Sequence, residues 1–565
     1  MGCVALNSAM AEPRPLTQTP AASLDWSHPG TPAATDFGDI YFSVDGGLEE
    51  TRAVFLNGCG LPEAWQARAV FTIAELGFGS GLNFLAAWQL WAKTARPEQR
   101  LHFVSIEKFP FDPAQLARAL SAWPELRPFS EPLIAAWPGR VKGLHRLNFG
   151  NVTLTLIHED ALTALEQLDT LKADAWFLDG FSPSGNPAMW SETLMAGVAE
   201  SCAPGARLAT FSVAGSVRTA LKQAGFEIRK MPGFGRKRHR LEADYPGETS
   251  VKSPKIDRAL IVGAGIAGRS LAQALATRHI PFDIIDNREH PAASGNPAAL
   301  VKPRFDLQDR PESRFFLSAY LQALRSYPEH SILERGVRQI PKSETEAKRF
   351  EKLAKQAALG DGHLEWRDDR LWIESALVVD PSKIFTEYEI RNEGYDAAQD
   401  RSDYSHVFLA AGYGIHALAP EMAMRFSRGQ LSWAEPVWDR AAAYGGYAIN
   451  LDGAALIGAT HDRLDGGDPF ELRPEDDIKN LSALERISGK TVSALPRTSR
   501  ASVRVTTSDT LPLTSKIGEN IWTLTGLGSR GFTFAPLLAE SLISALSGEV
   551  GPLEKGLRTK FSALR

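Results

Sequence analysis

The distribution of apolar residues along the chain indicates two α/β units in series. Short apolar runs that resemble buried strands alternate with stretches in which apolar residues recur at helical spacing. In the first half, the predicted strands are residues 70–76, 101–106, 152–157, 175–178 and 207–211. Each is followed by a polar or glycine-containing turn and then by a helical pattern, which predicts a largely parallel sheet.

A second strand–turn–helix pattern begins after a polar segment. Residues 246–256 mix Pro, Gly, Ser, Thr and charges, as linkers do. A new strand is predicted at residues 258–262, and residues 407–409 return to a strand followed by glycine. Residues 441–460 and 499–525 have strand-like patterns. The economical interpretation is a nucleotide-binding domain interrupted by a β-rich substrate subdomain.

The length of the chain agrees with this division. Its 565 residues exceed the roughly 250–300 at which single cores stop growing. We therefore expect a Rossmann-like α/β domain at residues 24–245, a linker at 246–256, and at 257–565 a second Rossmann domain with the inserted β-rich subdomain. Residues 1–23 are rich in Ala, Pro and Thr, and we expect them to be a disordered leader.

Composition narrows the classes of function. Apolar residues make up 44% and charged residues 23% of the chain, which is typical of globular proteins. The net charge of −5 excludes a global basic field, so any nucleic-acid contact must come from a local patch. Three scattered cysteines do not suggest a disulfide framework or a metal site. No apolar run approaches the roughly 18–20 residues of a membrane span, and we expect a cytoplasmic protein.

The first glycine loop is Glu75-Leu76-Gly77-Phe78-Gly79-Ser80-Gly81, of the E-x-G-x-G-x-G form typical of S-adenosylmethionine (SAM) sites. It lies between a predicted strand and helix, where glycines permit close backbone approach and free N–H groups are available. A tight turn is the alternative for the loop alone. Two acidic residues after later strands support SAM, because a carboxylate accepts hydrogen bonds from ribose hydroxyls or an adenine amino group. The predicted SAM-binding residues are Glu75, Gly77, Gly79, Gly81, Glu107 and Asp160.

Asp179 is the candidate catalytic residue of this half. It lies in Leu178-Asp179-Gly180-Phe181-Ser182-Pro183, at the carboxyl end of a predicted strand, where open α/β sheets place their ligands. It could orient an amine and accept its proton during methyl transfer. Phe181 and Trp190 could wall the methyl pocket. The alternative for Asp179 is a turn-forming residue before glycine.

The second glycine loop has the G-x-G-x-x-G form of dinucleotide sites, with Gly263, Gly265 and Gly268. Asp286 follows Gly268 by 18 residues, close to the roughly 20 expected for a ribose-binding acid. This spacing does not separate NAD from FAD. Three later segments do, because residues 294–296, 409–412 and 526–531 resemble those of D-amino-acid-oxidase-like flavoproteins. By that resemblance, the further FAD contacts are Ser294, Gly412, Gly528, Arg530 and Gly531.

Flavoproteins of that kind take a hydride from a carbon next to an amine nitrogen, and the resulting imine hydrolyses. An amino-acid-like substrate also needs its carboxylate held, which suits the arginine fork. Arg504 occupies the place where glycine-oxidase-like proteins hold the carboxylate, and Arg530 is the second candidate. For Arg500, a solvated surface position is the better interpretation.

The two predicted activities form a chemical sequence. An oxidase that cleaves an N-carboxymethyl group leaves a primary amine, which a methyltransferase can then methylate. The chain also resembles the family of bifunctional tRNA 5-methylaminomethyl-2-thiouridine biosynthesis proteins from about residue 24 to residue 549. The blocks that carry this resemblance are residues 39–42, 75–85, 179–183, 186–190, 233–238, 293–297 and 428–430.

The resemblance implies a tRNA substrate. The FAD half would convert 5-carboxymethylaminomethyl-(2-thio)uridine at the wobble position into the 5-aminomethyl form. The SAM half would then methylate it. Arg236, Lys237 and Arg238 are the candidate tRNA contacts, with a solvated charge run as the alternative. The wobble base lies in a single-stranded loop, from which a protein can splay it onto aromatic side chains. We expect a monomer.

Two other functions stay open at this point. The first is a small-molecule enzyme, an N-substituted glycine oxidase fused to an amine N-methyltransferase. The second is a non-catalytic RNA-binding protein that keeps degenerate nucleotide-binding folds.

Overall fold

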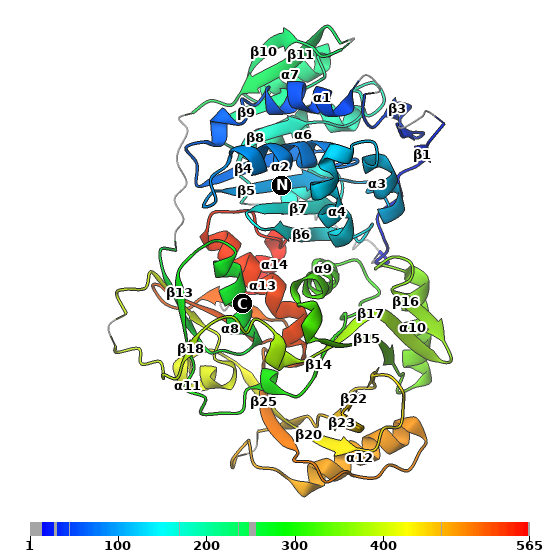
Figure 1. The fold of residues 1–565 in the computed structure, drawn as a ribbon, viewed down its shortest axis with the longest axis vertical. Coiled ribbons are helices and arrows are strands. Elements are labelled where there is room, and N and C mark those ends of the chain that lie inside the picture. Colours follow the sequence, from blue (N-terminus) through cyan, green and yellow to red (C-terminus); the bar gives the residue numbers. More distant parts are fainter. Residues whose placement is uncertain are drawn as a thin grey trace, which may run out of the picture.

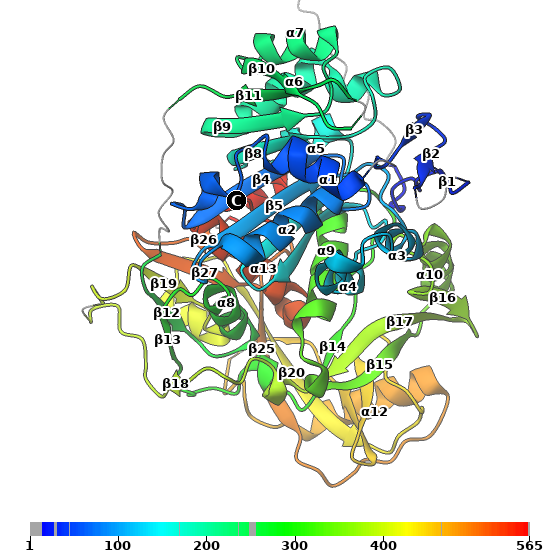
Figure 2. The ribbon, with the colours of Figure 1, turned by 45° about the horizontal axis from the view of Figure 1, so that its top comes forward.

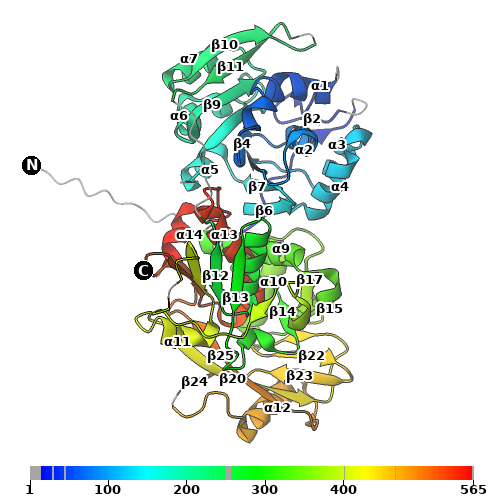
Figure 3. The ribbon, with the colours of Figure 1, turned by 60° about the vertical axis from the view of Figure 1, so that its left-hand side comes forward.

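The computed structural model describes residues 14–27, 31–43, 46–168, 170–235, 237–247, 256–399, 401–464 and 466–562. Two α/β units lie one above the other along the long axis, and a β-rich part forms the far end of the second unit (Figure 1). The predicted fold class is therefore confirmed. Figure 3, a view turned about the vertical axis, shows the same succession of layers.

The first unit is built on an eight-stranded sheet in the order β10-β11-β9-β8-β4-β5-β7-β6. Its five central strands are parallel, and antiparallel strands complete both edges. The strands are β4 (Val70–Leu76), β5 (Arg100–Ile106), β6 (Gly143–Phe149), β7 (Val152–His158), β8 (Ala173–Leu178), β9 (Cys202–Thr210), β10 (Glu227–Pro232) and β11 (His239–Asp244).

Helices cover both faces of this sheet, which explains why its central strands are continuous apolar runs. Phe71 and Ile73 of β4 belong to the core shared with α2, α3 and α4, whereas Ala74 and Leu76 pack with α5, α6 and α7. Figure 2 shows α2 lying across β4 and β5. The helices are α1 (Gly47–Thr51), α2 (Leu82–Thr94), α3 (Pro113–Leu120), α4 (Arg127–Ala136), α5 (Ala161–Gln167), α6 (Glu192–Glu200) and α7 (Gly215–Gln223).

The N-terminal part of the chain differs from the predicted disordered leader. Leu16 is buried against apolar residues of both units, and Pro15 forms a β-bridge with Gln308. The Thr19 N–H donates to the Arg140 carbonyl at 2.9 Å. Residues 14–23 thus lie along the two units because Leu16 finds an apolar site there, while residues 1–13 lie outside the described residues. A small sheet follows, with β1 (Leu24–Asp25), β2 (Ala33–Ala34) and β3 (Asp39–Ile40).

The second unit contains a six-stranded sheet in the order β18-β13-β12-β19-β27-β26, parallel except for β26. Its strands are β12 (Ala259–Val262), β13 (Phe282–Ile285), β18 (Ile390–Arg391), β19 (His406–Leu409), β26 (Leu513–Lys516) and β27 (Ile521–Thr525). Its helices are α8 (Ile266–Ala276), α9 (Pro311–Ser326), α11 (Ile415–Leu418), α13 (Gly531–Leu546) and α14 (Lys555–Lys560).

The β-rich subdomain is inserted between strands of the six-stranded sheet. Its own sheet has ten strands, with α10 (Glu344–Gln356) and α12 (Pro474–Ser488) packed beside it. The strands are β14 (Ala299–Val301), β15 (Ile332–Gln339), β16 (Leu364–Arg367), β17 (Arg370–Val379), β20 (Arg425–Ala434), β21 (Ala442–Ala443), β22 (Tyr447–Leu451), β23 (Ala454–Gly458), β24 (Asp462–Arg463) and β25 (Arg500–Thr506).

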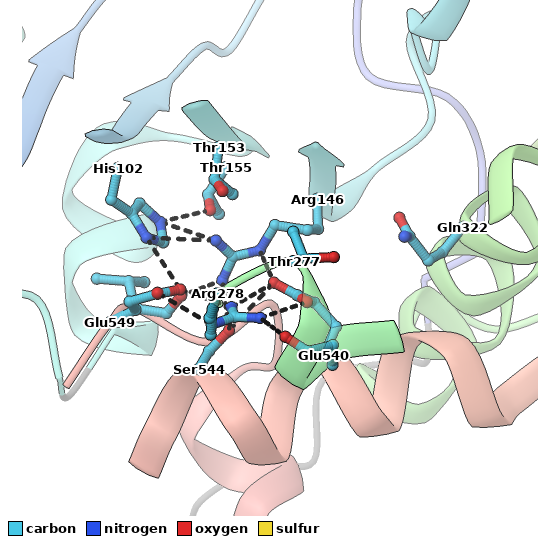
Figure 4. A network of polar contacts seen from close by, with 12 residues as sticks. His102, Arg146, Thr153, Thr155, Thr277, Arg278, Gln322, Glu540, Ser544 and Glu549 are labelled. Carbon is cyan, nitrogen blue, oxygen red and sulfur yellow. Dashed lines mark hydrogen bonds and ion pairs between the residues drawn. The ribbon is translucent and has the colours of Figure 1, made fainter. Parts of the chain in front are cut away.

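Buried charges join the two α/β units (Figure 4). Arg278, just after α8, donates to Glu540 of α13 at 2.7 Å and to Glu549 at 2.6 Å. From the first unit, Arg146 of β6 lies 3.6 Å from Glu540 and His102 of β5 lies 3.7 Å from Glu549. Burial lowers the pKa of His102 to about 4, so this imidazole is neutral at pH 7. We call these residues the interdomain ion cluster: Arg100, His102, Arg146, Arg278, Glu540 and Glu549.

Two expectations from composition concern thiols and membranes. Cys59 and Cys202 are buried free thiols, and burial raises the pKa of both. Cys3 lies outside the described residues. Within the described ranges, no helix is long and apolar enough to cross a bilayer.

Candidate active sites

The first glycine loop turns from β4 into α2 and lies against the segment that contains Asp179. Gly77, Gly79 and Gly81 have φ values of 80°, 53° and 75°, in the left-handed region that favours glycine. A Cβ at Gly77 would lie 3.2 Å from the Gly180 Cα atom. The structure therefore brings the predicted SAM loop and the predicted catalytic segment into direct contact.

Glu107 lies beside this loop, at the end of β5. Its carboxylate accepts the Gly79 N–H at 2.9 Å and the Phe109 N–H at 2.8 Å. Burial raises its pKa, and these backbone hydrogen bonds lower it. An acceptor at this position fits the ribose of SAM.

Asp160 has a structural function as well as the predicted one. It is the N-cap of α5 and accepts the Leu162 N–H at 3.2 Å, while Lys108 Nζ lies 3.1 Å from its other oxygen. Its contact with adenine stays a prediction.

Glu75 is directed into the protein beneath the loop. It is only 1% exposed, and its two oxygens accept hydrogen bonds from Asn83 Nδ2 at 2.9 Å and Ser105 Oγ at 2.6 Å. Burial raises its pKa well above the ordinary value. Glu75 therefore supports the site from below, and its oxygens are already engaged by the protein.

Asp179 is held by two hydrogen bonds. Oδ1 accepts the Gly180 N–H at 2.9 Å, and Oδ2 accepts from Asn83 Nδ2 at 2.8 Å. Burial raises the pKa of Asp179 to about 6, although these hydrogen bonds lower it. The carboxyl group is thus placed at the glycine loop with a pKa close to neutrality, as suits a proton acceptor.

Asn83 connects the two carboxyl groups, although it was not among the predicted site residues. Its amide nitrogen donates to both Glu75 and Asp179, and its oxygen accepts from Thr51 Oγ1 at 2.9 Å. The only signal was its place in the block 75–85, directly after the first residue of α2.

Aromatic side chains cover this site, and two of them were not predicted. Phe37 stacks on Phe181 with ring centroids 4.5 Å apart, and Tyr41 meets Phe181 edge-on at 5.2 Å. The Ser182 N–H donates to Asp39 at 2.8 Å, which fastens the small N-terminal sheet over the 179–183 turn. Trp190 is buried, and its indole N–H donates to the Phe181 carbonyl at 2.9 Å.

The basic cluster lies near the methyl-donor site. Lys237 Nζ lies 2.8 Å from Glu50 Oε1 and 4.5 Å from the centre of the Phe211 ring. Its charge is among those that lower the pKa of Asp179, after the larger effects of burial and hydrogen bonding. Arg238 is exposed, and Arg236 lies outside the described residues.

The second site is a cavity of about 900 Å³ in the second unit. This volume is in the upper part of the roughly 300–1,000 Å³ range of ligand pockets. Gly268 lies outside the cavity lining, and a Cβ there would lie 1.8 Å from the Gly263 carbonyl oxygen, so this glycine permits close packing. The predicted residues that line the cavity are Gly263, Gly265, Asp286, Ser294, Gly412, Arg504, Gly528, Arg530 and Gly531.

One end of the cavity fits a dinucleotide. Gly263 has φ 104°, and a Cβ there would lie 2.5 Å from the Ala410 carbonyl oxygen. Asp286, after β13, accepts the Ala264 N–H at 2.8 Å, and the Ile266 N–H at the start of α8 donates to Ser294 Oγ at 3.1 Å. This combination of a glycine turn, a helix N-terminus and an acidic residue is suited to the pyrophosphate and ribose of FAD.

The other end is cationic. Arg504 Nη1 donates to the Thr460 carbonyl at 3.1 Å, and Arg530 and Lys302 line the same cavity. Burial lowers the pKa of Lys302 to about 8 and that of Arg530 to about 10. Among the described residues, no carboxylate lies within ion-pair distance of these three side chains. This end can therefore receive an anionic group.

Arg500 differs from its interpretation as a solvated residue. It donates to Asn296 Oδ1 and to the Ala292 carbonyl, both at 2.7 Å. These bonds fasten the 292–296 loop next to the cavity.

Comparisons with known proteins agree with this pair of sites. A family of S-adenosyl-L-methionine-dependent methyltransferases matches residues 124–246, and FAD dependent oxidoreductases match residues 258–378 and 383–545. The tRNA 5-methylaminomethyl-2-thiouridine biosynthesis bifunctional protein MnmC of Maricaulis maris is 42% identical, over 94% of each chain. That of Caulobacter vibrioides is 41% identical, over 96% of this chain and 97% of the relative. The chain belongs to the MnmC family.

Membership of the MnmC family confirms the predicted cofactor pair. The chain carries a SAM-dependent methyltransferase domain and an FAD-dependent oxidoreductase domain, which excludes the non-catalytic interpretation. Among solved structures, iminodiacetate oxidase from Chelativorans sp. BNC1 is 18% identical, with a TM-score of 0.44 over 52% of this chain and 96% of that chain. A structure titled MNMC2 from Aquifex aeolicus is 26% identical, with a TM-score of 0.33 over 39% of this chain and 69% of that chain.

Proposed function

We propose that this MnmC-family chain modifies the wobble uridine of tRNA in two consecutive steps, as a cytoplasmic monomer. The first step removes the carboxymethyl group from 5-carboxymethylaminomethyl-(2-thio)uridine. The second step methylates the resulting 5-aminomethyl group to give 5-methylaminomethyl-2-thiouridine. The observation that carries this proposal is the contrast between a cationic cavity suited to a carboxylate and a buried carboxylate beside a SAM loop.

In the first step, Arg504 would bind the substrate carboxylate through its guanidinium fork, with Arg530 adding positive charge. Bound FAD supplies the hydride acceptor for the carbon between the nitrogen and the carboxylate. Water then hydrolyses the imine, which releases glyoxylate and leaves the primary amine.

In the second step, Glu107 would hold the ribose of SAM, and Asp179 would orient the amine in line with the methyl group. Asp179 also accepts the proton that the nitrogen loses, so that its lone pair is free to attack. Asn83 is a positioning residue in this scheme, because it fixes Oδ2 of Asp179. The stacked rings of Phe37 and Phe181 provide an apolar surface for the splayed base.

The tRNA backbone would contact Lys237 and Arg238 during methylation, together with Arg236. Lys237 is the member of this cluster that acts on the pKa of Asp179, which supports its position at the mouth of the methyl-donor site.

The test supplies the purified, flavin-loaded protein with tRNA that carries the 5-carboxymethylaminomethyl group. Without SAM, mass spectrometry of the nucleosides should show the 5-aminomethyl form, and with SAM the 5-methylaminomethyl form. Free N-substituted glycines serve as the comparison. Turnover of the free glycines with no change in the tRNA would overturn the proposal in favour of a small-molecule enzyme.

A further inference from the structure

We propose that the rim of the flavin cavity is an RNA-binding surface of its own, separate from the basic cluster of the methyltransferase domain. Lys342, Arg349 and Arg304 bind backbone phosphates next to the wobble nucleotide during the oxidative step. This inference rests on the proposed function, since it assumes a tRNA substrate. We call these three residues the rim cations.

The charges that line the cavity are unevenly distributed. The dinucleotide end has the acidic residues Asp286, Glu289 and Glu393. At the opposite end, Glu346 is the only acidic residue among the described lining residues. The cations at that end are Lys302, Arg304, Lys342, Arg349, Arg504 and Arg530. One substrate carboxylate cannot account for so many positive charges.

These cations form two groups by depth. Lys302, Arg504 and Arg530 are partly buried, and burial lowers their pKa values. Burial also lowers the pKa of Arg304, the least exposed of the rim cations. Lys342 and Arg349 are exposed to solvent although they line the same cavity. The deep group is therefore positioned for the carboxylate, and the exposed group surrounds the opening.

The rim cations contact backbone and aromatic groups. Arg349 donates to the Phe305 carbonyl at 2.8 Å, and Arg304 lies over the Phe316 ring at 4.4 Å. Lys342 Nζ lies 2.9 Å from the position that a Cβ at Gly445 would occupy, so it lies over the backbone there. In the part of the chain that the structure describes, none of the three forms an ion pair with a carboxylate.

Helix α10 provides an internal contrast. Lys348 and Lys355 on the same helix each pair with a glutamate four residues earlier at 2.7 Å, and neither lines the cavity. Arg349, one residue after Lys348, lines the cavity and has no such partner among the described residues. Arg349 thus lies at the opening without an acidic partner among the described residues, whereas Lys348 and Lys355 each have one.

Cations without acidic partners at the opening of the flavin cavity are suited to bind the phosphates of a single-stranded RNA loop. A nucleotide whose base enters the cavity keeps its phosphates outside, because the backbone is charged and remains hydrated. Protein cations that neutralise phosphates release counterions, and the dependence of affinity on salt reports their number. Because the whole chain has a net charge of −5, the protein surface as a whole does not attract RNA, and the attraction has to come from this patch.

The test compares two double variants with the same change in charge. One is K342E with R349E, and the control is K348E with K355E on the same helix. For each we would measure flavin content, the KM for tRNA in flavin reduction at several salt concentrations, and the KM for tRNA in methylation of a substrate that already carries the 5-aminomethyl group.

The rim variant should show at least a tenfold higher KM for tRNA in the oxidative step. The slope of log KM against log salt should become shallower by about 0.7 for each phosphate of single-stranded RNA that the protein no longer neutralises. Its KM for tRNA in methylation should equal that of the control. A KM that rises equally in both steps, or in neither, would overturn the inference.

Two further outcomes are separated by design. If the charge reversal lowers flavin content, the KM for tRNA in each of the two steps is measured instead on the neutral variants K342Q and R349Q. If the wild-type protein does not oxidise tRNA at all, the proposed function fails, whereas an active wild type with rim variants that match the control contradicts only the rim surface.

Discussion

The two active sites differ in the sign of their charge and in how their charges are satisfied. At the methyl-donor site, Glu75, Glu107 and Asp179 are acidic, and protein donors occupy their oxygens. At the deep end of the flavin cavity, Arg504 and Arg530 are cationic and have no acidic partner among the described residues. The acidic groups of the first site are thus held by hydrogen bonds within the protein, whereas the cations of the second are suited to an anionic ligand.

This difference explains how one chain can work on one nitrogen twice. The proposed first substrate carries a carboxylate, which the cationic cavity attracts. Removal of the carboxymethyl group also removes that charge, so the product loses its principal anchor in the cavity. The remaining amine is basic, and it suits a site where a carboxyl group accepts protons.

The largest effect is expected from Asp179→Asn. The amide keeps the shape of the side chain but cannot accept the proton of the amine, and general-base catalysis typically contributes about 10²–10⁴-fold. Methylation of a 5-aminomethyl tRNA should fall by that factor, while carboxymethyl removal continues, as nucleoside mass spectrometry would show. Equal loss of both steps would mean that the variant damages the whole protein.

Arg504→Ala should have the reverse selectivity. Removal of one partner of a buried charge pair costs about 2–5 kcal/mol, or roughly 30-fold to several thousandfold in rate. Carboxymethyl removal should be lost to that extent, with methylation of a pre-made 5-aminomethyl substrate intact. Arg504→Lys keeps the charge without the fork and should be intermediate. If both steps survive in Arg504→Ala, Arg530 is the anchor instead.

The pH dependence of methylation sharpens the comparison further. Burial raises the pKa of Asp179 to about 6, so the rate should fall as the pH drops through 6 and Asp179 becomes protonated. Asn83→Ala removes a hydrogen bond that lowers this pKa. The pKa should therefore rise in this variant, which moves the acid limb to higher pH.

Ser105→Ala is the matched control for that measurement, because Ser105 donates to Glu75 and not to Asp179. Its acid limb should stay close to that of the wild type. If the acid limb of the pH–rate profile does not move in Asn83→Ala, Asn83 is not a positioning residue for Asp179.

The smallest effect is expected at the basic cluster. Lys237→Glu combined with Arg238→Glu should weaken tRNA binding several-fold and reduce the slope of its salt dependence by about 0.7 per phosphate that is no longer neutralised. The affinity for SAM, measured by calorimetry, should not change. Lys222→Glu on α7 controls for net charge, and an unchanged tRNA affinity in the double variant would exclude the cluster as a tRNA-binding surface.

Local patterns in the sequence predicted the strands, both glycine loops and the acidic residues at strand ends. These features depend on periodicity and on residues close together in the chain. Asn83 could not be recognised in this way, because its partners Thr51 and Asp179 are 32 and 96 residues away. Phe37 was missed for the same reason, since the ring it stacks on belongs to another segment.

Two sequence interpretations failed because tertiary contacts changed the environment of a residue. Leu16 lies in a segment whose composition suggests disorder, but it packs against residues from both units. Arg500 has the character of a surface residue, yet it is bonded to the 292–296 loop. Glu75 belongs to the predicted SAM motif, and the structure shows it buried and bonded to Asn83, so its direct contact with SAM stays a prediction.

The interdomain ion cluster has a consequence for the order of events on the RNA. Charges that are almost fully buried between two bodies resist separation, because each would be left without a counterion in a poorly hydrated place. Separation of the oxidase from the methyltransferase at this cluster would therefore be costly, and we expect the two units to keep their arrangement during both steps. We therefore expect the anticodon arm to leave the flavin cavity and to bind the methyl-donor site in a separate step, while the protein stays rigid at this interface.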